Sequence, residues 1–153
     1  MKKLPVVLLF LTFGTAVFAQ DTKIDAGLGP EWNMNSPHNF AGGVLLNFNY
    51  NLPNDFAVGI NLGASTNFFG VFVIEAGALL RSYVLRADHC GLFLQIDAGI
   101  FIIHQDGDII PLVELGARGG FRFCLGSLFY LDPYIRFGYP FAFGVGVMAG
   151  FRL

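Results

Sequence analysis

The sequence has 153 residues, of which 54% are hydrophobic and only 13% are charged, with a formal net charge of −2. An average soluble domain is roughly 25% charged, so this composition indicates a surface that faces lipid, an apolar segment that is later removed, or both. The length suits one domain. The chain has no basic patch and no run of like charge, which argues against nucleic acid as a partner.

The first residues have the pattern of an export signal. Lys2 and Lys3 form a basic start, residues 6–13 are almost wholly apolar, and small residues follow where a signal peptidase cleaves. The apolar run is too short for a membrane anchor, which needs about 20 residues. We expect residues 1–19 to be a cleaved signal peptide and residues 20–153 to be the mature domain. Subtracting the two lysines from 9 Lys and Arg leaves 7 against 11 Asp and Glu, a net charge of −4.

The mature chain has a hydrophobic period of two. Large apolar residues alternate with small, polar or charged ones, and such alternation places the two sets on opposite faces of a strand. The alternating runs cover residues 24–28, 40–50, 56–62, 74–84, 92–102, 113–123, 129–137 and 141–153. Most of them reach the 9–11 residues that a tilted membrane strand requires. The pattern therefore predicts about eight strands.

Turn residues separate these runs. Asp106-Gly107 and Gly126-Ser127 are examples, and Asp-Gly between alternating runs is a strong hairpin signal. Because the gaps are short, neighbours in the sequence should pair as an up-and-down meander. The predicted fold is all-β, an antiparallel eight-stranded barrel. Pro133 lies inside one run, and since it lacks an N–H donor we expect a bulge or a local break there.

The bulk of the side chains indicates which face points inward. The lumen of an eight-stranded barrel is only just wide enough for side chains. The apolar face carries many Phe, Leu and Ile, which are too bulky for this lumen, whereas the other face is rich in Gly and Ala. We therefore predict a transmembrane barrel with its apolar face toward lipid, rather than a lipocalin-like soluble barrel. Aromatic residues near strand ends predict interfacial girdles: Trp32, Phe40, Tyr50, Phe56, Phe123, Phe129, Tyr139, Phe141 and Phe151.

The face assigned to the lumen carries charges of both signs in nearly equal number. The predicted ionic network consists of Lys23, Asp25, Glu75, Arg81, Asp97, Glu114, Arg118, Arg122, Asp132, Arg136 and Arg152. Buried charges must be paired, or each costs several kcal/mol. Two interpretations are available, a self-neutralised ionic plug and a charged pore lining. We favour the plug because eight strands leave little room for water.

Two cysteines, Cys90 and Cys124, belong to a chain that is expected to reach an oxidising compartment. Both should lie at the periplasmic rim on neighbouring strands. Strict alternation turns Cys90 outward and Cys124 inward, so a bridge requires turn bulges that correct the facing. The sequence leaves this disulfide open.

No residue constellation predicts catalysis, and we expect no cofactor and no metal site. The segment His104–Asp108 contains metal-binding residue types but has the composition of a polar hairpin tip. Ser36 and His38, near Glu31, supply the types of a nucleophile, a base and an orienting acid, but three polar residues in a loop rarely meet catalytic geometry. The protein is therefore not expected to be an enzyme.

The mature chain resembles the small eight-stranded outer-membrane barrels of the OmpA, OmpX and OmpW groups. The resemblance covers residues 20–153 and is carried by the alternating strands, by segments such as Glu75–Arg81 and Leu131–Gly138, and by a last strand that runs to the chain end. It implies a porin-like membrane protein of the cell outer membrane, a monomer in contact with outer-membrane lipid. It also implies insertion by the barrel-insertion machinery, which reads a final Phe in that family; this chain has Leu153 there, with Phe151 the nearest aromatic residue.

Three function classes follow. The leading class is a structural barrel or a narrow conduit for small apolar molecules, the latter by resemblance to the OmpW group. The alternative is a surface interaction or adhesion protein, which the short expected external loops at residues 33–39, 66–70, 104–108 and 139–140 make weaker. The third class is a lipid-modifying enzyme.

Overall fold

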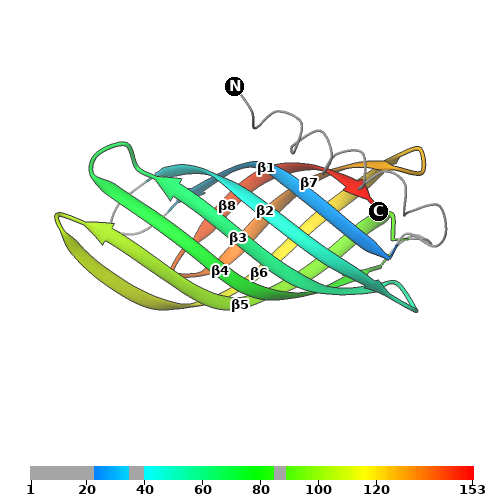
Figure 1. Cartoon of the computed structure of the whole chain (residues 1–153), viewed down its shortest axis with the longest axis horizontal. Coiled ribbons are helices and arrows are strands. Elements are labelled where there is room, and N and C mark those ends of the chain that lie inside the picture. The colour runs from blue at the N-terminus through cyan, green and yellow to red at the C-terminus, as the bar shows by residue number, and fades with distance from the viewer. Residues whose placement is uncertain (1–22, 35–39, 85–88) are drawn as a thin grey trace, which may run out of the picture.

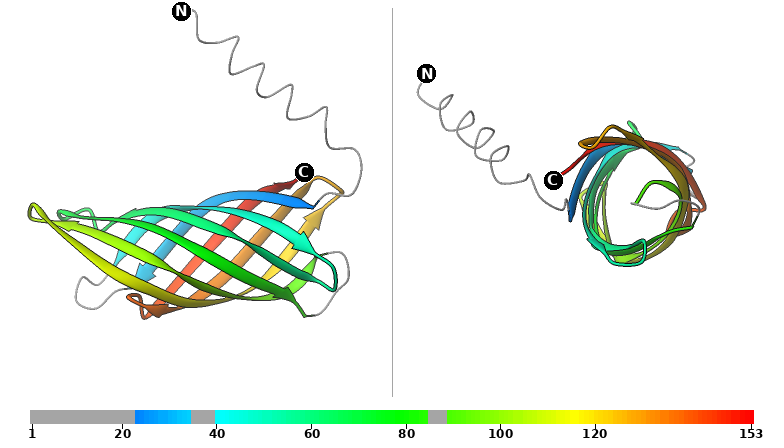
Figure 2. Two further views of the ribbon diagram at one scale, coloured as in Figure 1. Left: turned by 60° about the horizontal axis from the view of Figure 1, so that its bottom comes forward. Right: turned by 90° about the vertical axis from the view of Figure 1, so that its right-hand side faces the viewer.

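The computed structural model describes residues 23–34, 40–84 and 89–153. Its strands form one closed antiparallel barrel in which sequence neighbours pair and β1 closes on β8 (Figures 1 and 2). The eight strands are β1 Ile24–Met34, β2 Ala41–Leu52, β3 Phe56–Thr66, β4 Val71–Tyr83, β5 Gly91–Gln105, β6 Asp108–Leu125, β7 Phe129–Tyr139 and β8 Phe143–Arg152. The predicted eight-stranded up-and-down barrel is confirmed. Among the described residues, no helix has the length and apolar character needed to cross a membrane.

The two ends of the barrel differ in what they carry. β1 begins and β8 ends at the same end, which we call the terminal end (Figure 1). The opposite end, here the distal end, carries the turns from β3 to β4 and from β5 to β6. The expected signal peptide, residues 1–19, lies outside the described residues.

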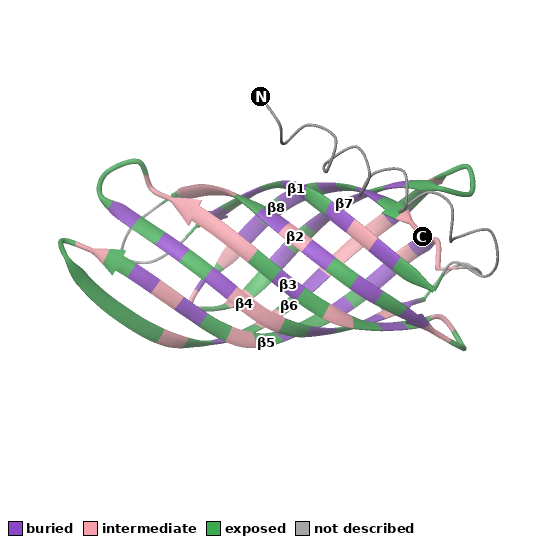
Figure 3. Cartoon of the chain, viewed as in Figure 1, coloured by how far each residue is buried: buried purple, intermediate pink, exposed green. Residues whose placement is uncertain are grey.

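Burial alternates along most of the barrel wall, as Figure 3 shows, whereas the first four residues of β6, 108–111, are all exposed. In β1, Asp25 and Glu31 are buried, whereas Leu28 and Trp32 are exposed on the outer surface. The outer surface is apolar throughout, with exposed side chains that include Val44, Ile60, Ile74, Leu94, Ile96, Ile100, Val113, Leu115, Ile135 and Val147. The predicted orientation, with bulky apolar side chains outside and small or charged ones inside, is confirmed.

Phe141 departs from the predicted aromatic girdle. It is only 3% exposed and points into the lumen, where its ring meets that of Phe101 at a centroid distance of 4.5 Å. Residues 140–142 lie outside the strands and β8 begins at Phe143, so the alternation does not extend back to Phe141. The prediction was wrong because it extended the strand through a turn.

Pro133 breaks the sheet locally without changing its register. Gly120 pairs with Tyr134 and Phe123 pairs with Leu131, in the same register on both sides of an interruption of two residues in β6. A bulge would shift the register, so only the predicted local break is present. The cause is the missing N–H of Pro133, which cannot donate to β6.

Glycines inside the barrel leave room for aromatic rings of the neighbouring strand. A Cβ at Gly150 would overlap the Tyr130 ring and the carbonyl oxygen of Ala26, whereas a Cβ at Gly119, on the outer surface, would meet nothing closer than Leu94 at 3.7 Å. Gly150→Ala should therefore lower the free energy of unfolding by about 1–3 kcal/mol through overpacking. Gly119→Ala should change it by no more than about 0.5 kcal/mol. Urea titration of the two variants in lipid vesicles measures the difference, and equal midpoints would contradict this packing.

Candidate functional site

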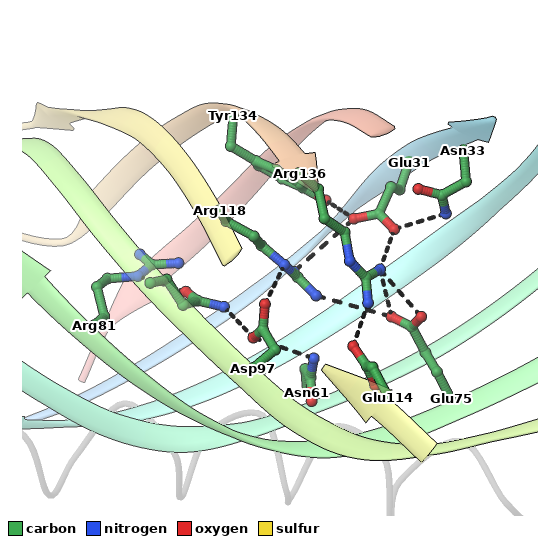
Figure 4. A network of polar contacts seen from close by, with 11 residues as sticks. Glu31, Asn33, Asn61, Glu75, Arg81, Asp97, Glu114, Arg118, Tyr134 and Arg136 are labelled. Carbon is green, nitrogen blue, oxygen red and sulfur yellow. Dashed lines mark hydrogen bonds and ion pairs between the residues drawn. The ribbon is translucent and has the colours of Figure 1, made fainter. Parts of the chain in front are cut away.

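The candidate site is the ionic network that fills the lumen, and Figure 4 shows the part of it around Arg136 and Arg118. Five strands, β1, β4, β5, β6 and β7, place charged side chains at inward positions, and each of these residues is at most 6% exposed. Among the described residues, the network contains four arginines and six carboxylates: Arg81, Arg118, Arg122, Arg136, Asp25, Glu31, Glu75, Asp97, Glu114 and Asp132. The network divides into two clusters along the barrel axis.

The distal cluster is centred on Arg136 of β7. Its Nη1 donates to Glu31 of β1 at 2.6 Å and to Glu75 of β4 at 3.1 Å, and its Nη2 donates to Glu114 of β6. Glu31 also accepts hydrogen bonds from the Tyr134 hydroxyl at 2.6 Å and from the Asn33 amide at 2.9 Å. One guanidinium therefore connects three strands that are far apart in the sequence.

Arg118 extends the distal cluster toward the middle of the barrel. Its Nε lies 2.9 Å from Asp97, and its terminal nitrogens lie 3.9 Å from Glu31 and 4.0 Å from Glu75. Asp97 accepts a second contact from the Gln95 amide at 2.6 Å. The distal cluster thus has two arginines for four carboxylates.

The terminal cluster is centred on Arg122 and Asp132. Arg122 donates from two nitrogens to Asp132, at 2.9 and 2.8 Å, and from the third to Asp25. Arg81 donates to the same Asp132 at 2.7 Å, so this cluster pairs two arginines with two carboxylates. Arg81 also donates from Nε to Gln95 at 2.8 Å. Because Gln95 in turn donates to Asp97, it connects the two clusters.

Aromatic rings cover the arginines where carboxylates do not. The guanidinium carbon of Arg122 lies 3.7 Å from the centroid of the Tyr130 ring, and that of Arg81 lies 4.0 Å from the Phe93 ring. Arg136 lies 4.6 Å from the Phe141 ring. Such cation–π contacts stabilise a charge that has lost its water.

Apolar side chains close the lumen beyond the distal cluster. They come from β4, β5 and the segment before β8, and all point inward: Val71, Val73, Phe101, Ile103 and Phe141. Leu112 packs against this group, which we call the distal lid. No member of the lid is more than 8% exposed. The lumen is thus filled by the lid, by the two ionic clusters and by a second group of buried side chains: Leu45, Ala57, Tyr83, Phe93, Tyr134 and Met148.

Two residues of the predicted network lie elsewhere. Lys23 is exposed one residue before β1, at the terminal rim, where its long side chain reaches solvent, so its predicted place in the lumen is corrected. Arg152 is half-buried at the same rim, and its Nη1 lies 3.7 Å from the sulfur of Cys90 and 3.8 Å from that of Cys124. The other nine predicted residues all lie in the two clusters.

Sequence reasoning missed Glu31, which it grouped with Ser36 and His38. The structure places the Glu31 carboxylate inside the barrel against Arg136, and Ser36 and His38 lie outside the described residues. The signal was present, because Asp25, Gly27, Gly29, Glu31 and Asn33 continue one inward face. Inward amides were also missed: Asn47, Asn49, Asn51, Asn61 and Gln95.

The predicted hairpin tip at His104–Asp108 is a two-residue turn between β5 and β6, and His104, Asp106 and Asp108 are exposed. Within residues 23–34, 40–84 and 89–153, no group of three or more His, Cys, Asp or Glu is arranged to hold a metal ion.

Cys90 and Cys124 form a disulfide, with their Cα atoms 6.0 Å apart. Cys124 is at an inward position of β6, as alternation requires. Cys90 precedes β5 and is flanked by two residues with positive φ, His89 at 55° and Gly91 at 100°. This local reversal of the backbone turns Cys90 toward Cys124, although strict alternation would turn Cys90 outward.

Comparison with known proteins identifies the fold. No protein-family profile matches the chain, and no curated protein matches its sequence. Several solved structures do match. Neisserial surface protein A has a TM-score of 0.60 and 12% identity over 85% of this chain and 96% of that one. The N-terminal β-barrel domain of Pseudomonas aeruginosa OprF gives 0.54 and 12% over 84% and 95%. The outer membrane protein OprG of the same organism gives 0.53 and 8% over 84% and 91%.

These neighbours are small outer-membrane β-barrels, and at such low identity they show the fold alone. The chain has the fold of the small eight-stranded outer-membrane barrels. Together with its apolar outer surface, this fold is consistent with a place in the cell outer membrane.

The distal cluster has more carboxylates than arginines, and this excess of negative charge allows a test of the network. Arg136→Met should lower the free energy of unfolding by about 3–5 kcal/mol, because it leaves Glu31, Glu75 and Glu114 without their shared cation. Glu114→Gln keeps a hydrogen-bond acceptor and removes one surplus negative charge, so it should cost about 1 kcal/mol or less. Urea titration in vesicles compares them, and a Glu114→Gln variant as unstable as Arg136→Met would contradict the network.

The disulfide closes a loop with a sequence separation of 34 residues, so it should stabilise the barrel by about 2–4 kcal/mol. Adding reductant should lower the urea midpoint of the native protein. The double variant Cys90→Ser/Cys124→Ser should have the lowered midpoint from the start and should not respond to reductant. A reductant effect of equal size on that double variant would show that the loss has another origin.

Proposed function

We propose that this protein is a structural barrel of the outer membrane with a closed lumen, and that it is neither a conduit nor an enzyme. One observation supports this most strongly. Every charged side chain of the two lumen clusters is buried and paired with charged or polar groups of other strands. Because each of these charges is held by partners on other strands, none is free to line a water-filled path along the axis.

The energies involved favour a permanently closed lumen. A solute that moves along the axis must displace the distal lid and then separate both ionic clusters. Breaking a buried ion pair typically costs about 3–5 kcal/mol, and each of Arg136 and Arg122 holds more than one carboxylate. The proposal therefore assigns the network a structural role, that of joining strands from opposite walls of the barrel.

The other function classes have less support. Catalysis requires a substrate to reach the acidic groups, and these are shielded from solvent. An adhesion role usually depends on long loops, whereas the described distal turns span only residues 67–70, 106–107 and 140–142. As part of the proposal, residues 1–19 are a cleaved export signal and the terminal end faces the periplasm. The last strand is then read by the insertion machinery, and the barrel is a monomer in outer-membrane lipid without a cofactor.

Planar-bilayer recording tests the closed lumen. The native barrel should give no steady conductance, and Phe101→Ala/Phe141→Ala should stay closed, because the two ionic clusters remain when the lid is thinned. Arg118→Ala/Arg136→Ala, which removes both arginines of the distal cluster together with the lumen volume they fill, should give brief or steady openings. Heat-modifiable gel mobility verifies that each variant is folded. A large, steady conductance of the native protein would refute the proposal.

A further inference from the structure

A groove of about 350 Å³ lies on the outer surface of the barrel at its distal end. Its walls are the rings of Trp32 from β1, Phe68 from the β3–β4 turn and Phe72 from β4. Small residues of β2 and β3 form its floor: Gly42, Gly43 and Ala64. We call this feature the aromatic groove. None of its lining residues is charged.

The β3–β4 turn is built to hold Phe68 over this floor. Phe68 has a positive φ of 63°, a conformation that costs a bulky residue energy and persists only where the surroundings impose it. Hydrogen bonds impose it here: the Phe68 amide donates to the Thr66 hydroxyl at 3.1 Å, and the Asn67 side chain accepts from the amides of Phe69 at 2.9 Å and Val71 at 3.0 Å. The groove wall is therefore preformed.

The groove is continuous with the lipid-facing surface. Val44, Leu62 and Ile74 are exposed apolar residues of the strands that carry it. β3 has 11 residues between Phe56 and Thr66, which matches the 9–11 residues that a tilted strand needs to cross the hydrocarbon. The turn thus lies where the hydrocarbon ends on the distal side, and the groove opens among lipid chains.

The positions of the described Lys and Arg residues indicate that the groove binds the apolar part of a lipid. In the part of the chain that the structure describes, the Lys and Arg residues are the four lumen arginines plus Lys23 and Arg152 at the terminal rim. No described Lys or Arg side chain lies near the aromatic groove, and the one described imidazole beside it is that of His104, which is paired with Phe72 across β4 and β5. We therefore expect the groove to recognise the acyl chain of a lipid and not its headgroup.

We propose that the aromatic groove binds one acyl chain of a membrane lipid, without selecting its headgroup. The chain lies on the small-residue floor between Trp32 and the turn-held Phe68, and Phe72 closes the side. This places an ordered lipid at a fixed position on the outer surface of the barrel. The inference is independent of whether the lumen conducts.

Two alanine-to-leucine variants distinguish lipid binding in the groove from lipid binding elsewhere on the outer surface. Ala64 follows Gly63, which faces the inward Glu75, so Ala64 faces outward and Ala64→Leu should fill the groove from outside and leave the lumen untouched. Ala117→Leu makes the same change at an exposed, outward position of β6 and is the matched control. Trp32 is the only tryptophan of the chain, so its fluorescence reports the groove directly.

The experiment adds phosphatidylcholine with brominated acyl chains to the full mature barrel in detergent. The native protein and Ala117→Leu should show saturable quenching of Trp32 and a one-lipid adduct in native mass spectrometry. Ala64→Leu should lower the affinity at least about tenfold, because the leucine excludes methylene groups from the apolar site. Phosphatidylglycerol should bind within about twofold of phosphatidylcholine.

Four results would overturn the proposal. The first is the absence of saturable quenching and of an adduct in the native protein. The second is equal affinity of Ala64→Leu and Ala117→Leu. The third is a more than tenfold preference for one headgroup, which would assign recognition to the phosphate region. The fourth is a two-copy species that Ala64→Leu abolishes, which would assign the groove to a second barrel.

Discussion

The structure depends on one constraint, the narrowness of an eight-stranded barrel. Its lumen has room for side chains but little room for water, so every charge placed inside must find its partner among other side chains. Arg136 and Arg122 meet this requirement by reaching carboxylates of several strands at once. The same narrowness requires small residues beside the large ones, as Gly150 beside Tyr130 shows. Charge pairing and glycine placement are thus two consequences of one geometry.

The inside and the outside of the barrel are stabilised by different kinds of interaction. Inside, hydrogen bonds and ion pairs replace water, and Gln95 joins the two clusters into a continuous network. Outside, no directional contact is required, and bulky apolar side chains meet lipid. This division explains why a chain with so little charge can still bury four arginines among its described residues. The few charges present are concentrated where only mutual pairing can stabilise them.

Much of the fold could be predicted from the sequence, because a period of two and the bulk of Phe determine both the strands and their orientation. The failures have local causes. Phe141 was placed outside because alternation was extended through a turn, and Glu31 was missed because the first strand was expected to end at residue 28, whereas β1 continues to Met34. The exact partners of each arginine depend on strand register and tilt, which no local pattern encodes. The facing of Cys90 depends on two positive φ angles beside it.

If the lumen is closed, the outer surface is where the protein contacts other molecules. If nothing passes along the axis, the protein meets its surroundings through its lipid-facing belt and its short turns. The aromatic groove is the place on that belt where the backbone adopts a costly conformation to fix an apolar ring. In this account, the polar interior provides rigidity, and the apolar exterior provides the contacts by which the barrel orders the lipid around it.

A nitroxide scan along β5 tests the central claim that charges face inward and apolar side chains face lipid. Single labels are placed at residues 93–98 of the protein in vesicles, and collisions with lipid-dissolved oxygen and with a water-soluble nickel complex are measured. Labels at 94, 96 and 98 should collide with oxygen, and labels at 93, 95 and 97 should be shielded from both reagents. Collisions with nickel at 94, 96 and 98 would contradict the account, because the apolar face would then lie in water.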